Sequence, residues 1–412
     1  MDKPKFFYGW VIVFISFLML LVTSGIVLSF GIFMKPLTSE FQWDRTAVSI
    51  AVSSFMLVQG LLSPLVGRLI DRYGPKIVVT LGVFILGVTL IIFGQVNSYF
   101  MFFFTYGILA AIGYSTTTLM TNSVLITKWF TEKKGLALGL SMTGFPLGPL
   151  VFSPFIGYLI VTFDWRTAAL ILGGLLIVLL MPLVLLLVKD NPETAANKAV
   201  DDGERKKVTF KGLLANKQYL KLAGAYFGCG YTMSMISTHF PANATDLGLD
   251  PLVAATAFGI MGGFAAVGTT SAGALSDKFG RKNILSIVYF MRFAALMVFA
   301  FAYSPVTLYV GAVIFGLSWT TTGPLTSALT GDIWGVKVMG TVFGFVFLSH
   351  QIGAALGAYL GGYIFDYTES YQMAFLSGAL ILFISGINSF LIQESSKEPG
   401  VPVKESYQTK EL

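Results

Sequence analysis

Ionisable side chains are rare inside the apolar stretches of this chain, and the exceptions are basic. All 21 Asp and Glu residues lie in polar segments or at the ends of apolar stretches. Arg292 and His350 lie near the middle of two such stretches, where an ionised group in a membrane costs at least roughly 2.5–3.5 kcal/mol. A guanidinium can hold a carboxylate through paired hydrogen bonds, and a histidine changes charge near neutral pH. These two residues are candidates for binding an organic anion together with a proton.

Each of these candidates also has a structural interpretation. Arg292 could hydrogen-bond helix carbonyls, and His350 could stay neutral and bond a neighbouring helix. Gln351 follows His350 but points about 100° away on a helix, so it is a weaker candidate. His239, in the sequence His-Phe-Pro241, lies near the end of another apolar stretch and is a candidate for gating access.

Uncharged polar residues form a second set of binding candidates. On a helix, Tyr114, Thr118 and Asn122 share one face at four-residue spacing. Gln59, in an earlier apolar stretch, is a further candidate. Hydroxyls and amides can satisfy a carboxylate without charge, but Ser and Thr in membrane helices also bond the carbonyls of the preceding turn.

No pattern indicates an enzyme, a metal site or a bound cofactor. The sequence contains neither a phosphate-binding Gly-rich loop ending in Lys-Ser/Thr nor a nucleophile elbow. With one cysteine, Cys229, and two histidines, an internal disulfide and a Cys- or His-rich metal centre are excluded. The net charge of +6 comes from loops beside apolar stretches, where membrane topology explains it better than a nucleic-acid partner does.

Composition requires a membrane to position these residues. Of 412 residues, 55% are hydrophobic and 12% are charged, against about 25% charged in soluble proteins. A spanning helix needs roughly 20 mostly apolar residues, and the sequence predicts an all-α membrane protein of twelve such helices. The predicted spans are 8–34, 46–67, 77–97, 99–127, 135–162, 166–188, 218–242, 252–275, 283–303, 305–330, 338–365 and 371–393. Pro146 and Pro149 should bend the fifth span or leave carbonyls free.

The spans divide into two bundles of six. We predict an N-terminal bundle over 1–188, a cytoplasmic linker over 189–217, a C-terminal bundle over 218–394 and a cytoplasmic tail over 395–412. With both termini in the cytoplasm, 23 of the 27 basic residues lie inside and three lie outside (Lys35, Arg45 and Arg166). This asymmetry favours a multi-pass plasma-membrane protein with both termini in the cytoplasm.

A charged motif occurs once in each predicted bundle. It reads Gly67-Arg-Leu-Ile-Asp71-Arg72-Tyr-Gly74 and Gly273-Ala-Leu-Ser-Asp277-Lys278-Phe-Gly280, 206 residues apart. A second set of residues recurs at an offset of 205: Trp129, Gly135, Gly139, Gly148 and Gly157 correspond to Trp334, Gly340, Gly344, Gly353 and Gly362. Such repeats are typical of secondary transporters, in which two homologous halves move against each other.

The paired motif resembles the signature of the major facilitator superfamily. Three further segments are similar to monocarboxylate transporters and to the oxalate/formate antiporter group: Tyr8-Gly9-Trp10, residues 40–46 and residues 129–139. The resemblance implies two pseudo-symmetric six-helix bundles and an alternating-access carrier of small organic anions. It also implies that Gly67, Asp71, Arg72, Gly273, Asp277 and Lys278 latch a conformation without touching substrate.

The chain departs from that family pattern at two positions. An arginine is usual eight residues before the acidic position of the second motif, and here Thr269 occupies that place. Leu28 falls where animal monocarboxylate carriers keep a lysine. Thr269 is therefore a binding candidate without the charge that the resemblance implies.

Together these observations predict a monomeric secondary transporter of small monocarboxylates, working by proton symport or by anion exchange. One alternative is a facilitator or exporter of neutral or drug-like solutes, which the missing arginine favours. A more distant alternative is a membrane sensor that keeps the carrier fold without transporting.

Overall fold

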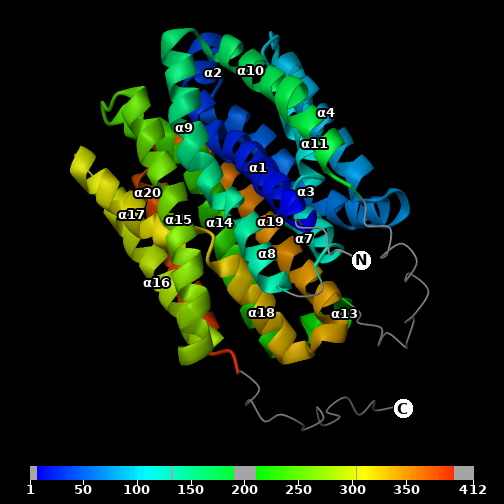
Figure 1. Cartoon of the computed structure of the whole chain (residues 1–412). Helices are drawn as coiled ribbons and strands as arrows, with labels where there is room; N and C mark the ends of the chain where they lie inside the picture. The colour runs from blue at the N-terminus through cyan, green and yellow to red at the C-terminus, as the bar shows by residue number, and fades with distance from the viewer. Residues whose placement is uncertain (1–6, 131–132, 190–209, 303, 394–412) are drawn as a thin grey trace.

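The computed structural model describes residues 7–130, 133–189, 210–302 and 304–393 (Figure 1). These ranges are helical and contain no strand. The first half comprises α1 (Gly9–Leu28), η1 (Ser29–Phe33), α2 (Met34–Phe41), α3 (Arg45–Tyr73), α4 (Pro75–Phe93), α5 (Tyr99–Phe102), η2 (Phe103–Ala110), α6 (Ala111–Ser115), α7 (Leu119–Thr127), α8 (Lys134–Met142), α9 (Gly144–Thr162), α10 (Trp165–Gly174), η3 (Leu175–Leu180) and α11 (Met181–Leu187). The second half comprises α13 (Phe210–Leu214), α14 (Lys217–Asp246), α15 (Pro251–Phe279), α16 (Arg281–Ala300), α17 (Pro305–Trp319), α18 (Thr322–Trp334), α19 (Val336–Thr368) and α20 (Gln372–Phe390).

Ten helical segments of the described ranges are long and apolar enough to cross a membrane. The predicted spans 99–127 and 218–242 account for the difference from twelve. The first is divided, and only Tyr99–Ser115 forms a shorter apolar helix. The second is α14, which has 30 residues but buries polar side chains such as Thr232, Ser237 and His239. Both segments are helical; the first falls short in length and the second in apolar character.

The prediction of one continuous helix over 99–127 is wrong. α6 ends at Ser115, and α7 begins at Leu119. Between them, the hydroxyls of Thr116 and Thr117 donate to the carbonyls of Gly113 and Tyr114, at 2.9 and 3.1 Å. Hydroxyls that bond the preceding turn compete with the backbone ladder. A run of such residues therefore interrupts the helix.

The equivalent helix of the second half is interrupted at the same place. The predicted span 305–330 divides into α17, which ends at Trp319, and α18, which begins at Thr322. At the offset of 205, Trp319 corresponds to Tyr114 in the first interruption. The fifth span also divides, between α8 and α9 at Thr143. Pro146 has no N–H to donate to a carbonyl four residues earlier, which explains this last break.

Each half has its own apolar core. One cluster of buried side chains comes almost wholly from residues 12–188, and a second comes from residues 213–392. Some residues cross between them: Leu28 and Phe145 pack in the second cluster, and Ala255 and Ala358 pack in the first. The position at which the resemblance implies a lysine, Leu28, therefore lies against apolar side chains of the other half.

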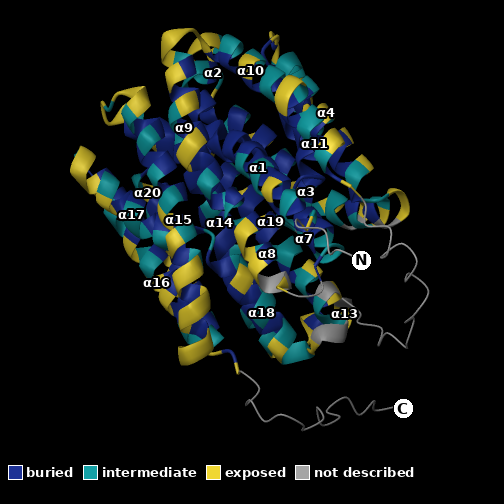
Figure 2. Cartoon of the chain, viewed as in Figure 1, coloured by how far each residue is buried: buried dark blue, intermediate teal, exposed yellow. Residues whose placement is uncertain are grey.

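Apolar side chains also cover much of the outer surface. Exposed residues follow the outward faces of helices such as α16 (Figure 2). Phe100, Val178 and Leu61 expose 77%, 78% and 72% of their surface. In water, an apolar surface of this kind would drive association. In a membrane, the same surface matches the apolar lipid chains around it. The helices satisfy their own backbone groups, as a membrane demands.

Glycines set the close packing inside each half. A methyl group at Gly148 of α9 would lie 2.6 Å from the backbone nitrogen of Gly25 in α1. At the equivalent Gly353 of α19, a methyl group would overlap the carbonyl of Phe227 in α14. Small residues let membrane helices approach closely. The α1–α9 and α14–α19 pairs are thus counterparts in the two halves.

Candidate functional site

The two halves touch mainly along two pairs of helices, α3 with α19 and α9 with α15, and η1 of the first half also packs against α14. We call the end of the molecule that holds Arg45, Asp246 and Asp366 the Arg45 end, and the opposite end, with the repeated charged motif, the motif end. Near the Arg45 end, Gly362 of α19 lies against α3: a methyl group there would be 2.5 Å from Ser49 Oγ. Its counterpart, Gly157 of α9, lies against α15. A methyl group added at Gly157 would be 2.8 Å from Ala255 Cβ.

The contacts between halves stop before the motif end. Added methyl groups at Gly139 of α8, Gly344 of α19 and Gly273 of α15 would meet no described atom within 4 Å. Among the described residues, every hydrogen bond and ion pair between the halves lies between Arg45 and Gln59 along the first half's α3, or at Lys35. The halves are therefore closed at the Arg45 end and separated at the motif end.

Polar residues from both halves meet near the middle of this contact. Gln351 of α19 donates to Gln59 Oε1 at 2.9 Å and to the Met56 carbonyl at 3.0 Å. Nearby, Ser53 Oγ donates to the carbonyl of Ala355 at 2.7 Å. The structure thus brings Gln59 together with Gln351, the residue that the helical angle had ranked below its neighbour His350.

His350 lies beside this contact, within the second half. Its Nδ1 is 3.0 Å from Gln351 Oε1, and its ring centroid is 4.6 Å from that of Tyr226. The side chain exposes 7% of its surface. His350 therefore adjoins the last polar contact between the halves before they separate.

Arg292 is engaged inside the second half. Its Nη2 donates to the carbonyls of Ser318 and Trp319, the latter at 2.6 Å, and its Nη1 donates to Cys229 Sγ at 3.2 Å. Those carbonyls end α17 and have lost their helical partners at the interruption. The guanidinium is fully buried and satisfies this helix end. The geometry fits the structural interpretation better than carboxylate binding.

The uncharged candidates are placed separately. Tyr114 is buried against Phe55, with ring centroids 5.8 Å apart. The interruption after Ser115 separates Tyr114 from Thr118 and Asn122, so the three do not share one continuous helical face. The amide of Asn122 donates to the Thr118 carbonyl at 3.1 Å. In the second half, Thr269 lies 2.8 Å from Thr320, at the interruption of the equivalent helix.

The repeated motif forms matching tight turns at the motif end. Gly74 and Gly280 close α3 and α15 with φ of 82° and 87°, a conformation that favours glycine. Gly67 and Gly273 lie about two turns earlier on those helices. Arg72, Asp277 and Lys278 are exposed, and no ion pair among the described residues includes them; the side chain of Asp71 lies outside the description. These exposed side chains lie at the end where the halves are separated.

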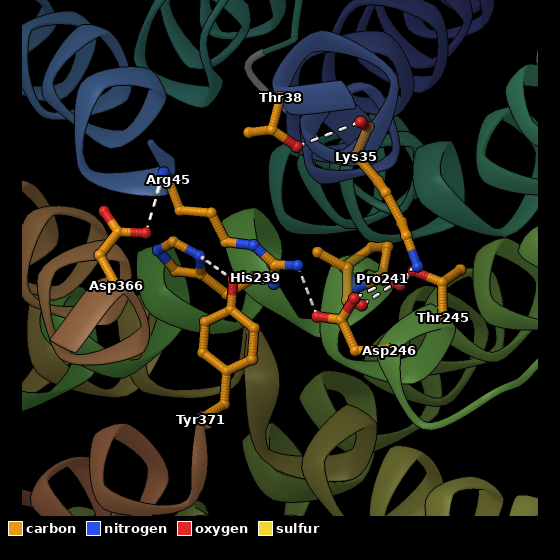
Figure 3. A network of polar contacts seen from close by, with 10 residues as sticks. Lys35, Thr38, Arg45, His239, Pro241, Thr245, Asp246, Asp366 and Tyr371 are labelled. Atoms are coloured by element: carbon orange, nitrogen blue, oxygen red, sulfur yellow. Dashed lines mark hydrogen bonds and ion pairs between the residues drawn. The ribbon is translucent and has the colours of Figure 1, made fainter. Parts of the chain in front are cut away.

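A charged network closes the Arg45 end (Figure 3). Arg45 Nη2 pairs with Asp246 at 2.6 Å, and its Nη1 donates to the Tyr371 hydroxyl at 2.7 Å. Lys35 pairs with the same Asp246 at 3.2 Å. Arg45 exposes only 8% of its surface. Two cations of the first half thus hold one carboxylate of the second.

A second carboxylate reinforces this closure through the backbone. Asp366 of α19 accepts the N–H groups of Arg45 and Thr46 at 3.1 and 2.7 Å. These groups belong to the first turn of α3, whose own cap residue Asp44 makes no side-chain bond to them. A carboxylate at a helix N-terminus satisfies orphan donors and the helix dipole. Here the cap is supplied by the other half.

His239, the predicted gating residue, is joined to this network. Its Nδ1 lies 3.0 Å from the Tyr371 hydroxyl, and its Nε2 lies 2.8 Å from the Ala358 carbonyl. The ring is fully buried between α14, α19 and α3. The structure therefore links the histidine to Arg45 through one tyrosine.

Sequence reasoning missed this network, although the internal repeat contains a signal for it. At the offset of 206, Glu40 corresponds to Asp246 and Trp165 to Tyr371. In the first half, Glu40 is held locally by Arg166 at 2.6 Å and by Trp165 at 2.5 Å. Gln372 replaces that arginine in the second half, so Asp246 takes its cations from the other half.

A local helix cap supports the first-half network. Asp164 precedes α10 and accepts the N–H of Thr167. This hydrogen bond holds the pKa of the Asp164 carboxyl below its usual range. The capped helix presents Trp165 and Arg166 to Glu40, so that this pairing stays within one half.

A cavity of about 300 Å³ also opens between the halves at the Arg45 end. It is lined by Lys35 and by mostly apolar residues that include Ile32, Ile160 and Pro241. None of the central polar candidates lines it. The cavity therefore belongs to the closed end rather than to the region around His350.

Comparison with known proteins agrees with this architecture. Residues 10–345 and 222–410 match the profile of the Major Facilitator Superfamily. The chain is 28% identical to an uncharacterized MFS-type transporter, YcxA, of Bacillus subtilis (strain 168), over 94% of this chain and 97% of that protein. It is 26% identical to monocarboxylate transporter 13 of Rattus norvegicus, over 94% and 89%.

Two further similarities concern a carrier and a solved structure. The oxalate:formate antiporter of Oxalobacter formigenes is 23% identical over 96% of this chain and 93% of that protein. A bacterial homolog of the human lysosomal transporter Spinster, crystallised in an inward-facing and occupied conformation, superposes with a TM-score of 0.76. The superposition covers 95% of this chain and 97% of that one at 16% identity, which shows a shared fold.

Proposed function

The chain belongs to the Major Facilitator Superfamily, and on that premise we propose that it transports small monocarboxylates by alternating access. Like these relatives, which are transporters, it is a membrane transporter and not an enzyme. The named monocarboxylate and oxalate:formate carriers among those relatives support a small organic anion as cargo. The coupling is proton symport or anion exchange.

The observation that carries this proposal is the position of His350 and Gln351. They lie at the last polar contact between the halves, next to Gln59, on the side from which the halves separate towards the motif end. A histidine and two amides can bind a carboxylate by hydrogen bonds, with added charge when the ring is protonated. The acidic residues, in contrast, lie at helix ends and in polar segments, away from this region.

Alternating access assigns roles to the halves and to their ends. Residues 1–188 and 218–394 move as two units joined by residues 189–217, part of which lies outside the described residues. The network around Arg45 and Asp246 closes one end, and the motif residues Asp71, Arg72, Asp277 and Lys278 close the other in turn. With both termini in the bacterial cytoplasm, the Arg45 end faces outwards and the motif end faces inwards.

A second candidate cargo is a neutral solute. Arg292 is occupied by the carbonyls of Ser318 and Trp319, and Thr269 replaces an arginine. Among the described residues, His350 is then the group near the centre that can supply charge, and a facilitator of neutral molecules needs none. This observation favours the alternative over a carrier of strongly charged anions such as dicarboxylates.

Uptake into proteoliposomes separates the two cargoes. We expect labelled lactate or pyruvate to accumulate when an inward proton gradient or an internal exchangeable anion is provided. Unlabelled monocarboxylates should compete, and sugars or uncharged drugs should not. If every carboxylate fails both to enter and to compete, the anion proposal is wrong and the neutral solute is favoured.

A further inference from the structure

The ring of His239 is tightly enclosed by neighbouring residues. A methyl group at Gly361 of α19 would overlap the imidazole, so the glycine leaves the space that the ring fills. Ser49 of α3 lies 3.5 Å from Nε2 on the side of the first half. The histidine is therefore enclosed by both halves and is exposed only when they part at the Arg45 end.

The hydrogen bonds around the ring determine its protonation state in this conformation. The Ala358 carbonyl can only accept, so Nε2 carries a proton and donates to it. The Tyr371 oxygen already accepts from Arg45 Nη1, and its own proton is directed to His239 Nδ1. A neutral ring, with Nδ1 as acceptor, satisfies the hydrogen-bonding groups of Tyr371 and His239 and the Ala358 carbonyl. The order is Arg45 to Tyr371 to His239 to Ala358.

A second proton on the ring would break this arrangement. Nδ1 would become a donor, and the Tyr371 hydroxyl would have to accept from both Arg45 and His239. Its own proton would then have no acceptor among the described residues. An unmade hydrogen bond in a buried site costs about 1–3 kcal/mol. The closed end therefore selects against the protonated ring.

The surrounding charges act in the same direction. The charged and titratable side chains that face the ring are Lys35 of α2, Arg45 of α3, Asp246 of α14 itself, Asp366 of α19, and Tyr371 before α20. Two cations and two carboxylates balance one another. A protonated His239 would add one buried positive charge without a partner, which is costly.

We propose that His239 is a proton-binding site that opens the Arg45 end: the closed conformation holds the neutral ring, and the proton binds only when the halves part there. The inference rests on the proposed alternating access and not on the cargo. Acid at the Arg45 end shifts the carrier towards the conformation open to that side. Closing the end releases the proton again.

Distance measurements between spin labels test this inference without any substrate. Ser39→Cys in α2 and Tyr367→Cys in α19 place one label on each half at the Arg45 end, at exposed positions. The native Cys229 is buried. We expect the population with a long distance to rise about tenfold from pH 8 to pH 5, because a solvated histidine changes charge in that range. His239→Gln, which cannot be protonated, should lose this response.

The chain offers a matched control, because His239 and His350 are its two histidines. His350→Gln in the same labelled background should keep the pH response. Retention of the full response in His239→Gln, or its loss only in His350→Gln, would overturn the proposal. Because no cargo is present, either result leaves the monocarboxylate assignment to the uptake assay.

A second measurement covers the case in which His239→Gln does not fold. Nitrogen-15 NMR of histidine-labelled protein should give two pairs of ring signals, one pair from each histidine, and the pair lost in His350→Gln belongs to His350. In protein held closed at the Arg45 end, we expect the His239 ring to stay a neutral Nε2–H tautomer down to pH 5. A doubly protonated ring in the closed protein would contradict the inference.

Discussion

At the scale of single residues, burial and local partners decide the role of each charged group. Arg292 and Arg45 are both almost fully buried, yet their partners differ. Arg292 binds carbonyls inside one half, so it contributes to the stability of that half. Arg45 binds a carboxylate and a hydroxyl of the other half, so it contributes to the stability of one conformation.

Replacement of Arg292 by Ala should destabilise the protein. The carbonyls of Ser318 and Trp319 would lose their partner in a buried site, and we expect the free energy of unfolding to fall by roughly 2–4 kcal/mol. Thermal unfolding in detergent checks this. On the same helix, Arg281 forms a partly exposed pair with Asp332, so Arg281→Ala should cost about 0–1 kcal/mol. Normal stability of Arg292→Ala, combined with loss of substrate binding, would instead favour a binding role.

Replacement of His350 by Gln should weaken cargo binding. The amide can still donate a hydrogen bond but cannot supply a positive charge, and loss of charge assistance is worth roughly tenfold in KM. Uptake rates over a range of substrate concentrations and pH values measure this. An unchanged KM at every pH would remove His350 from the site.

The sequence singles out isolated polar residues inside apolar stretches, but it does not single out the carboxylates of the network at the Arg45 end. Arg292, His350, His239 and Gln59 stand out because a polar side chain inside an apolar stretch needs a reason. Asp246 and Asp366 lie at helix ends, where carboxylates are ordinary and carry no such signal. Their importance depends on Arg45, which is distant in sequence and meets them only when the halves pack.

At the scale of the elements, hydroxyl runs and glycines shape the helices. The spans are predicted from the length of each mostly apolar stretch. That length does not reveal the interruptions after Ser115 and Trp319. The Thr residues at those points were visible in the sequence, but whether their hydroxyls bond the preceding turn or a cargo depends on the neighbouring helices. The repeat at 205 residues did predict matching glycines, and Gly157 and Gly362 make matching contacts.

A glycine at the interface should control how tightly the Arg45 end closes. In Gly362→Ala the new methyl group would be 2.5 Å from Ser49 Oγ and 2.8 Å from the Arg45 carbonyl, so we expect the closed conformation to be disfavoured. The label pair at positions 39 and 367 would show a larger share of long distances. Gly344→Ala, on the same helix but in open space, should leave that distribution unchanged. Equal behaviour of the two variants would show that Gly362 does not determine closure.

At the scale of the whole molecule, the two similar halves differ in the ion-pair partners of two equivalent acidic residues. Glu40 is held within its own half by Arg166, whereas Asp246 depends on Arg45 of the other half. This asymmetry gives one end of the molecule a charged closure between the halves, which the proposed alternating access requires to break. The composition and the repeat predicted the two halves and the membrane, but not which end is closed in this conformation.

The most direct test of transport by alternating access is to lock the Arg45 end. Thr46 and Asp366 are in side-chain contact at 2.5 Å, so Thr46→Cys with Asp366→Cys should form a disulfide across the halves on oxidation. We predict that the reduced protein moves labelled pyruvate into proteoliposomes, that oxidation abolishes this uptake, and that a reductant restores it. Uptake that is equally fast in the oxidised protein would contradict the account.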